Sequence, residues 1–180
     1  SDYQIIMVIG IDSDRNIYVI DYMREHIPLY DMPEQILEYA REFSPVKRVN
    51  VEHVGAQGII KDAVNSLSGK ERKVAPGIAL GVRPPSGIKK EDRLESLLAP
   101  IVNRRKMFIK RSHNSLVDEM FQFPKGKNDD ILDGLWYAIN KARPPVSKKF
   151  DALDFLENKT VKSVSKTTKR VISWVTGQKI

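Results

Sequence analysis

Three aspartates, Asp129, Asp130 and Asp133, stand at the start of a segment with helical periodicity. At about 100° per residue they lie within about 100° of one another, opposite the apolar stripe. That stripe is formed by Ile131, Leu132, Leu135, Trp136 and Ile139. Like charges this close repel unless water screens them or a cation holds them together. The segment is either a metal-binding face or an ordinary amphipathic helix with Asp129 as its N-cap and the other two acids near the positive end of the dipole.

Glu52 is a further carboxylate of interest, because it stands near the end of a strand predicted over residues 46–54. Burying a lone charge there costs several kcal/mol, on the order of a broken buried ion pair, unless a metal or an arginine pairs with it. Ligands of open α/β sheets bind beyond the carboxyl ends of the strands. We therefore expect Glu52 to meet the start of the acidic helix, an ion-paired strand-end glutamate being the alternative. The neighbouring His53 is expected to point to the other face as a packed or hydrogen-bonded side chain.

Carboxylates without Cys or His partners suit Mg²⁺ or Mn²⁺. Two such ions about 4 Å apart are the usual arrangement for phosphodiester cleavage, in which one activates water and the other stabilises the leaving oxygen. Lys90 and Arg93 are spaced to hold a phosphate, although from spacing alone a surface helix of mixed charge is the more ordinary explanation. Asp12, Asp14 and Asp21 also invite a metal interpretation, but turn residues and a strand-end acid account for them more simply. The residues together indicate a metal-dependent nuclease.

The elements that would position these side chains begin with two strands, over residues 4–11 and 17–22, joined by a polar turn. Further strands are predicted over 46–54, 77–82 and 106–110, the last at a sheet edge. Helices are predicted from a capping Asp31 to Phe43, over 59–67, from about Lys89, and over 115–121 after a capping Ser or Asn. A hairpin beside crossover strands implies a mixed β-sheet flanked by helices, an α/β fold.

Length and composition are those of one domain with an appendage: 180 residues, 41% hydrophobic and no Cys. The missing Cys excludes disulfides and thiolate metal sites. No run approaches the roughly 20 apolar residues of a membrane span, and no signal-peptide pattern opens the chain, so we expect a soluble intracellular protein without a membrane partner. The absence of a P-loop, a dinucleotide fingerprint and a Gly-x-Ser-x-Gly elbow excludes further enzyme classes.

The positive charge is concentrated at the end of the sequence. The whole chain carries +7, of which the residues from Lys148 onward contribute +5. Pro144 and Pro145 mark the boundary, so we expect a core over residues 1–143 and a basic extension over 144–180 that is either helical or flexible. The excess favours a polyanionic partner.

Five segments in order resemble the C-terminal nuclease domain of the large terminase subunit of tailed bacteriophages. They are Ser-Asp-Tyr-Gln-Ile-Ile-Met-Val-Ile-Gly (1–10), Asn-Ile-Tyr-Val-Ile-Asp (16–21), Val-Asn-Val-Glu (49–52), Lys-Glu-Asp-Arg-Leu (90–94) and Asn-Asp-Asp-Ile-Leu-Asp-Gly-Leu (128–135). The resemblance covers about residues 1–142 and depends on order and spacing. It implies an RNase H-like fold and a nuclease that cuts concatemeric double-stranded DNA with two divalent ions during genome packaging, in the host cell cytoplasm.

The resemblance also implies roles for individual residues. Glu52 corresponds to the family's second acid, its last acids lie within residues 129–133, and Lys90 with Arg93 matches a basic motif near its active site. We accordingly expect catalytic roles for Glu52, Asp130 and Asp133, binding of Mg²⁺ or Mn²⁺ by these three with Asp129, and contacts of Lys90 and Arg93 with DNA phosphates. Which of the three aspartates bind metal stays open.

One departure concerns the family's first catalytic Asp, on an opening strand that would precede Ser1 and is absent from this sequence. Without that bridging carboxylate, we expect either a truncated nuclease domain that is inactive as it stands, or a domain in which another segment supplies the strand. The family's packaging ATPase domain would also precede it, and the portal protein and small terminase subunit are further partners the resemblance leaves open. Two alternatives stay open: a noncatalytic DNA-binding or portal-docking assembly module, and another RNase H-like nuclease such as a junction resolvase or transposase.

Overall fold

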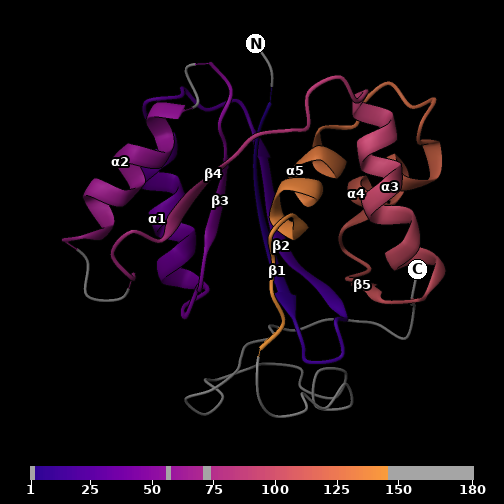
Figure 1. The fold of residues 1–180 in the computed structure, drawn as a ribbon, viewed down its shortest axis with the longest axis horizontal. Helices are drawn as coiled ribbons and strands as arrows, with labels where there is room; N and C mark the ends of the chain where they lie inside the picture. Colours follow the sequence, from indigo (N-terminus) through magenta and orange to yellow (C-terminus); the bar gives the residue numbers. More distant parts are fainter. Residues whose placement is uncertain (1–2, 56–57, 71–73, 146–180) are drawn as a thin grey trace. The chain divides into compact units, whose positions relative to one another are not determined.

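The structure, a computed structural model, describes residues 3–55, 58–70 and 74–145 (Figure 1). The chain divides into two compact units. The first contains the residues up to Ile6 together with Met23–Ser86, and the second contains Met7–Tyr22 and the residues from Gly87 onward. The predicted basic extension, apart from residues 144–145, lies outside the described ranges. Within those ranges, no helix combines the length and apolar character needed to cross a membrane.

Strands β1 (Gln4–Ile11) and β2 (Ile17–Glu25) contribute residues to both units. They are neighbours joined by the short loop 12–16, and so run antiparallel as predicted. Strand β5 (Met107–Ile109) pairs in parallel with β2, Ile17 opposite Met107, which gives the order β1-β2-β5. The sheet is mixed, and β5 lies at its edge as predicted. Strand β2 continues three residues beyond its predicted end.

The first unit is built on a second, two-stranded sheet. Strands β3 (Val49–Glu52) and β4 (Ala79–Val82) pair in parallel, and helix α2 (Gly58–Ser68) connects them. Helix α2 packs on both strands and on helix α1 (Met32–Glu42), as Figure 1 shows. Its Asn65 holds the start of β4, because the side-chain amide donates to the carbonyl of Ala79 at 3.0 Å and accepts from its N–H at 2.8 Å. The core between these elements is apolar: Met32, Ile36, Leu37, Ala40, Val51, Ile60, Val64, Val74, Ile78 and Ala79.

Two local predictions for this unit are wrong in detail. The strand expected over residues 46–54 covers only Val49–Glu52, because four residue pairs are all that β4 offers in register. Asp31 does occupy the N-cap position of α1, but its side chain makes no capping hydrogen bond. Pro33 in the first turn has no N–H that needs a partner, which reduces the requirement for a cap.

Three helices form the body of the second unit: α3 (Lys90–Asn103), α4 (Asn114–Gln122) and α5 (Asp130–Ile139). Helix α5 packs against both α3 and α4. Its predicted apolar stripe is confirmed, since Ile131, Leu132, Leu135, Trp136 and Ile139 are all buried. The N-cap of α4 is His113, whereas Ser or Asn was expected there.

The observed architecture confirms the predicted fold class in its general form. The protein is α/β, with a small mixed sheet and helices that flank it. The predicted single mixed sheet is divided, within the described residues, into sheets of three and two strands.

Candidate functional site

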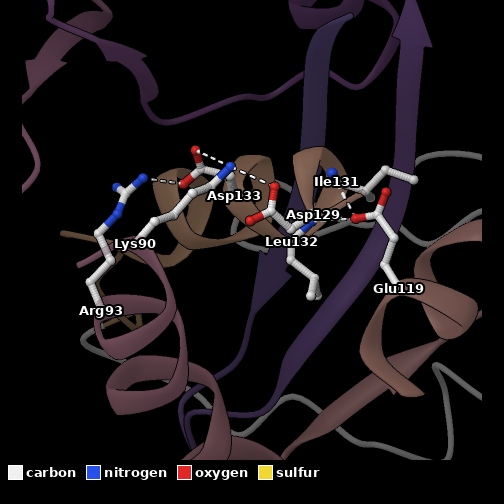
Figure 2. Close-up of polar contacts among 7 residues, drawn as sticks. All are labelled: Lys90, Arg93, Glu119, Asp129, Ile131, Leu132 and Asp133. Atoms are coloured by element: carbon white, nitrogen blue, oxygen red, sulfur yellow. Dashed lines mark hydrogen bonds and ion pairs between the residues drawn. The ribbon is translucent and has the colours of Figure 1, made fainter. Parts of the chain in front are cut away.

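The acidic end of α5 faces two basic side chains of α3 (Figure 2). The Lys90 ammonium lies 2.7 Å from Oδ1 of Asp129 and 3.4 Å from Oδ2 of Asp133. The Arg93 guanidinium donates to Oδ1 of Asp133 at 2.6 Å. Residues that the sequence assigned to metal binding and to phosphate binding are thus brought together as partners of one another.

Asp129 does not cap its helix in the way the sequence suggested. It occupies the N-cap position of α5, yet its side chain makes no capping hydrogen bond. Glu119 of α4 does so instead: its Oε2 accepts from the N–H groups of Ile131 at 2.9 Å and Leu132 at 3.1 Å. The Asp129 carboxylate therefore faces Lys90 while a residue from another helix satisfies the backbone.

Arg93 is an unusually enclosed cation, with only 8% of its surface exposed. Its guanidinium lies over the rings of Trp136, at 4.7 Å from the centroid, and Tyr137, at 5.4 Å. These aromatic faces replace part of the water that the charge loses on burial. Its Nη1 is buried without a hydrogen-bond partner among the described residues, so Arg93 keeps donor capacity beyond its bond with Asp133.

Electrostatics at this site hold Lys90 in its charged form. Burial by itself would lower the pKa of Lys90, but the hydrogen bond with Asp129 and the charge of Asp133 outweigh burial and raise that pKa. One ammonium and one guanidinium thus balance two carboxylates. Each of these four groups belongs to the second unit.

The donor chemistry at this site fits a divalent ion such as Mg²⁺ or Mn²⁺, since two carboxylates converge on a single cationic group. That group is the Lys90 ammonium, so an ion would have to exchange with it. In the parts of the chain that the structure describes, no three His, Cys, Asp or Glu side chains stand together closely enough to hold a metal. Asp129 and Asp133 are the two carboxylates that share this cation.

Glu52 ends β3, opposite Val82 in the parallel pair, and is half-buried. It belongs to the first unit and the aspartates to the second, so their convergence stays a prediction. The neighbouring His53 is packed as expected. A Cβ added to Gly58 would lie 3.0 Å from the His53 ring, and one added to Gly81 would lie 3.1 Å from it, so both glycines leave room for the imidazole.

Asp12 has the structural role that its turn position indicated, whereas Asp21 lies within β2 and not at the end of that strand. Asp12 is 2% exposed and accepts four hydrogen bonds, from the N–H groups of Asp14 and Asn16, the Asn16 side chain and the Tyr18 hydroxyl. Burial and the hydrogen bond to Asp12 raise the pKa of Tyr18, so the hydroxyl stays protonated and donates. This carboxylate closes the β1–β2 turn.

Sequence reasoning missed two buried polar residues of the second unit, Glu119 and His113. Glu119 follows Leu116 by three residues, which places both on the buried face of α4, and this spacing was a signal for it. His113 lies 3.8 Å from Asp21 and packs edge-on to Tyr22. Burial, together with the charge of Lys110, lowers the pKa of His113 to about 4, so the imidazole is neutral at neutral pH.

Comparison with models of known protein families, with curated proteins and with solved structures found no match for this chain. The grounds for assigning a function are therefore the side chains and their geometry.

Proposed function

We propose that this chain is the metal-dependent endonuclease domain of a viral DNA-packaging terminase, RNase H-like in fold, which cuts concatemeric double-stranded DNA. The observation that supports this most is the convergence of Asp129 and Asp133 on one cationic group at the start of α5. Acids that share a cation in this way have the hard oxygen donors that Mg²⁺ and Mn²⁺ prefer. The resemblance of the five sequence segments supports the same activity.

In this proposal Glu52, Asp130 and Asp133 are the catalytic acids, and with Asp129 they hold two Mg²⁺ or Mn²⁺ ions. Such ions supply an activated water and stabilise the leaving oxygen of the phosphodiester. Lys90 and Arg93 contact DNA phosphates once their carboxylate partners are engaged elsewhere. The enclosed Arg93 suits this role because its unused Nη1 keeps donor capacity beside the acids.

The proposed setting is the cytoplasm of the infected host cell during virion assembly. The partners are double-stranded DNA, a packaging ATPase domain in the same polypeptide, and the portal protein and small terminase subunit. The basic residues from Lys148 onward supply most of the net charge for a polyanion.

Calorimetric titration of the full chain with Mn²⁺ tests the proposal, followed by incubation with supercoiled plasmid. We expect Glu52→Gln to weaken Mn²⁺ binding at least about tenfold. Loss of a group that only hydrogen-bonds to a metal ligand already weakens binding by about that factor, and loss of a ligand itself should weaken it more. Asp118→Asn, which removes an exposed carboxylate from α4, is the matched control and should bind as the wild type does. Equal affinities for wild type and Glu52→Gln would remove Glu52 from the site.

A noncatalytic DNA-binding or portal-docking module is the second candidate, and one observation favours it. Lys90 and Arg93 already neutralise Asp129 and Asp133, as they would in a purely structural contact between α3 and α5. This candidate predicts salt-dependent DNA binding that Mn²⁺ leaves unchanged, with intact plasmid after incubation. Nicked or linear plasmid that requires Mn²⁺ would exclude it.

A further inference from the structure

Glu119 is a buried carboxylate that the proposed chemistry does not use. Only 6% of its surface is exposed, and it lies on α4, ten residues before Asp129 in the sequence. Its Oε2 accepts from two consecutive backbone N–H groups, those of Ile131 and Leu132. These are the second and third residues of α5, where an isolated helix leaves its N–H groups without partners.

The capping of α5 thus has an unusual division of roles. A carboxylate at a helix N-terminus is stabilised by the dipole and by charge-assisted hydrogen bonds, and a helix normally obtains it from its own N-cap residue. Here Asp129 holds the N-cap position without capping, and its Oδ1 lies 2.7 Å from the Lys90 ammonium. Because Glu119 satisfies the backbone, the Asp129 carboxylate is available to a cation (Figure 2).

The contact also fixes where the acidic helix begins. The side chains of Ile131 and Leu132 are buried, so their backbone is held from two sides, by packing and by Glu119. Asp129 and Asp133 are joined to this turn by the N–H of Asp133, which donates to the carbonyl of Asp129 at 2.9 Å. A shift of the first turn would therefore move both carboxylates relative to Lys90.

We propose that Glu119 is a positioning residue, which caps α5 in place of Asp129 and so holds the Asp129 and Asp133 carboxylates in the geometry that binds cations. It touches neither DNA nor the ions, and acts through the backbone of Ile131 and Leu132. The part of this inference that concerns divalent ions rests on the proposed function. The part that concerns Lys90 does not.

Two mild variants separate the reach of the Glu119 oxygen from its charge. Glu119→Gln keeps an oxygen at the same distance and removes the charge, whereas Glu119→Asp keeps the charge and withdraws the oxygen by one methylene. If Glu119 positions the helix, the affinity of Glu119→Gln for Mn²⁺ should lie within about threefold of the wild-type affinity. The affinity of Glu119→Asp should be about tenfold weaker, which is the loss typical of residues that support a metal ligand without touching the metal. Asp118→Asn on the same helix is the control for charge alone. The opposite order, with Glu119→Asp unchanged and Glu119→Gln weakened, would show a simple charge effect and overturn the inference.

A second readout on the metal-free chain distinguishes failure of this inference from failure of the proposed function. The ¹⁵N signal of the Lys90 Nζ and amide exchange at Ile131 and Leu132 are recorded for each variant. We expect Glu119→Asp to shift the Lys90 signal and to speed exchange at both amides, and Glu119→Gln to shift them much less. A wild type that binds no Mn²⁺ would remove the nuclease proposal, and the Lys90 signal would still decide the role of Glu119. Faster exchange in Glu119→Asp with an unchanged Lys90 signal would make Glu119 merely structural.

Discussion

Asp12 differs from Asp129 and Asp133 in the partners of its carboxylate. Asp12, in the turn between β1 and β2, accepts four hydrogen bonds, all from uncharged donors within six residues of it. Asp129 and Asp133, at the start of α5, have cationic partners about 40 residues away on α3. The Asp12 carboxylate is enclosed by its own turn, whereas the Asp129 and Asp133 carboxylates lie at a contact between helices α3 and α5.

The type of partner determines how readily another ligand can replace it beside the carboxylate. Donors on the backbone of a closed turn leave only when the turn unfolds, and Asp12 is almost fully buried. Lys90 is a flexible side chain with about a third of its surface exposed, so a cation can replace it beside the carboxylates, and a phosphate can replace the carboxylates beside it, at low cost. Under the proposed function, the carboxylates with exchangeable cationic partners form the binding site, whereas the carboxylate held by local neutral donors closes a turn.

The largest effect is expected from Asp12→Ala. The substitution leaves the Tyr18 hydroxyl and the Asn16 side chain without their acceptor in a buried turn, and we expect a loss of roughly 4 kcal/mol in the free energy of unfolding. Urea unfolding followed by circular dichroism measures it. The exposed Asp14→Ala in the same turn is the control, with an expected change within about 0.5 kcal/mol. Equal costs for the two variants would contradict the structural role of Asp12.

A somewhat smaller effect concerns His113, which is buried 3.8 Å from Asp21. Because the pKa of His113 falls to about 4 in the folded protein, the unfolded chain binds a proton that the folded one does not between about pH 4 and 6.5. The free energy of unfolding should therefore fall as pH decreases through this range, by on the order of 3 kcal/mol from this group. Urea unfolding at pH 4 and pH 7 measures the difference, which His113→Asn should reduce. An unchanged difference in His113→Asn would refute the assignment.

The smallest effects compare the two cations of the α5 site. Arg93→Met removes a nearly buried ion pair and the contacts over Trp136 and Tyr137, for which we expect about 2 kcal/mol of destabilisation. Lys90→Met should cost less than about 1 kcal/mol, since its pair is partly exposed. Raising the salt concentration to 1 M should abolish most of the Lys90 contribution and little of the Arg93 contribution. Equal costs and equal salt dependence would mean that Lys90 is as firmly held as Arg93.

Local patterns in the sequence predicted most of the elements around these sites. The apolar stripe of α5 and the turn between β1 and β2 follow from spacing and turn chemistry alone, and both are confirmed. The ion pairs of Lys90 and Arg93 with the aspartates depend on how α3 packs against α5, which no local pattern contains. The capping of α5 by Glu119 has the same origin, since a residue of α4 satisfies backbone groups that the sequence assigned to Asp129. Strand β3 is shorter than the predicted segment 46–54 because its partner, β4, sets the length of the pairing.

The central claim, that the acids of α5 bind a divalent cation and those of the β1–β2 turn do not, is tested most directly by a Mn²⁺ titration of the ¹⁵N-labelled chain. Paramagnetic broadening reports which amides lie near the ion. We predict that the signals of Asp129–Asp133 disappear at substoichiometric Mn²⁺ while those of Asp12–Asn16 persist, and that excess Mg²⁺ restores the lost signals. Equal broadening in both segments, or none at Asp129–Asp133, would contradict the claim.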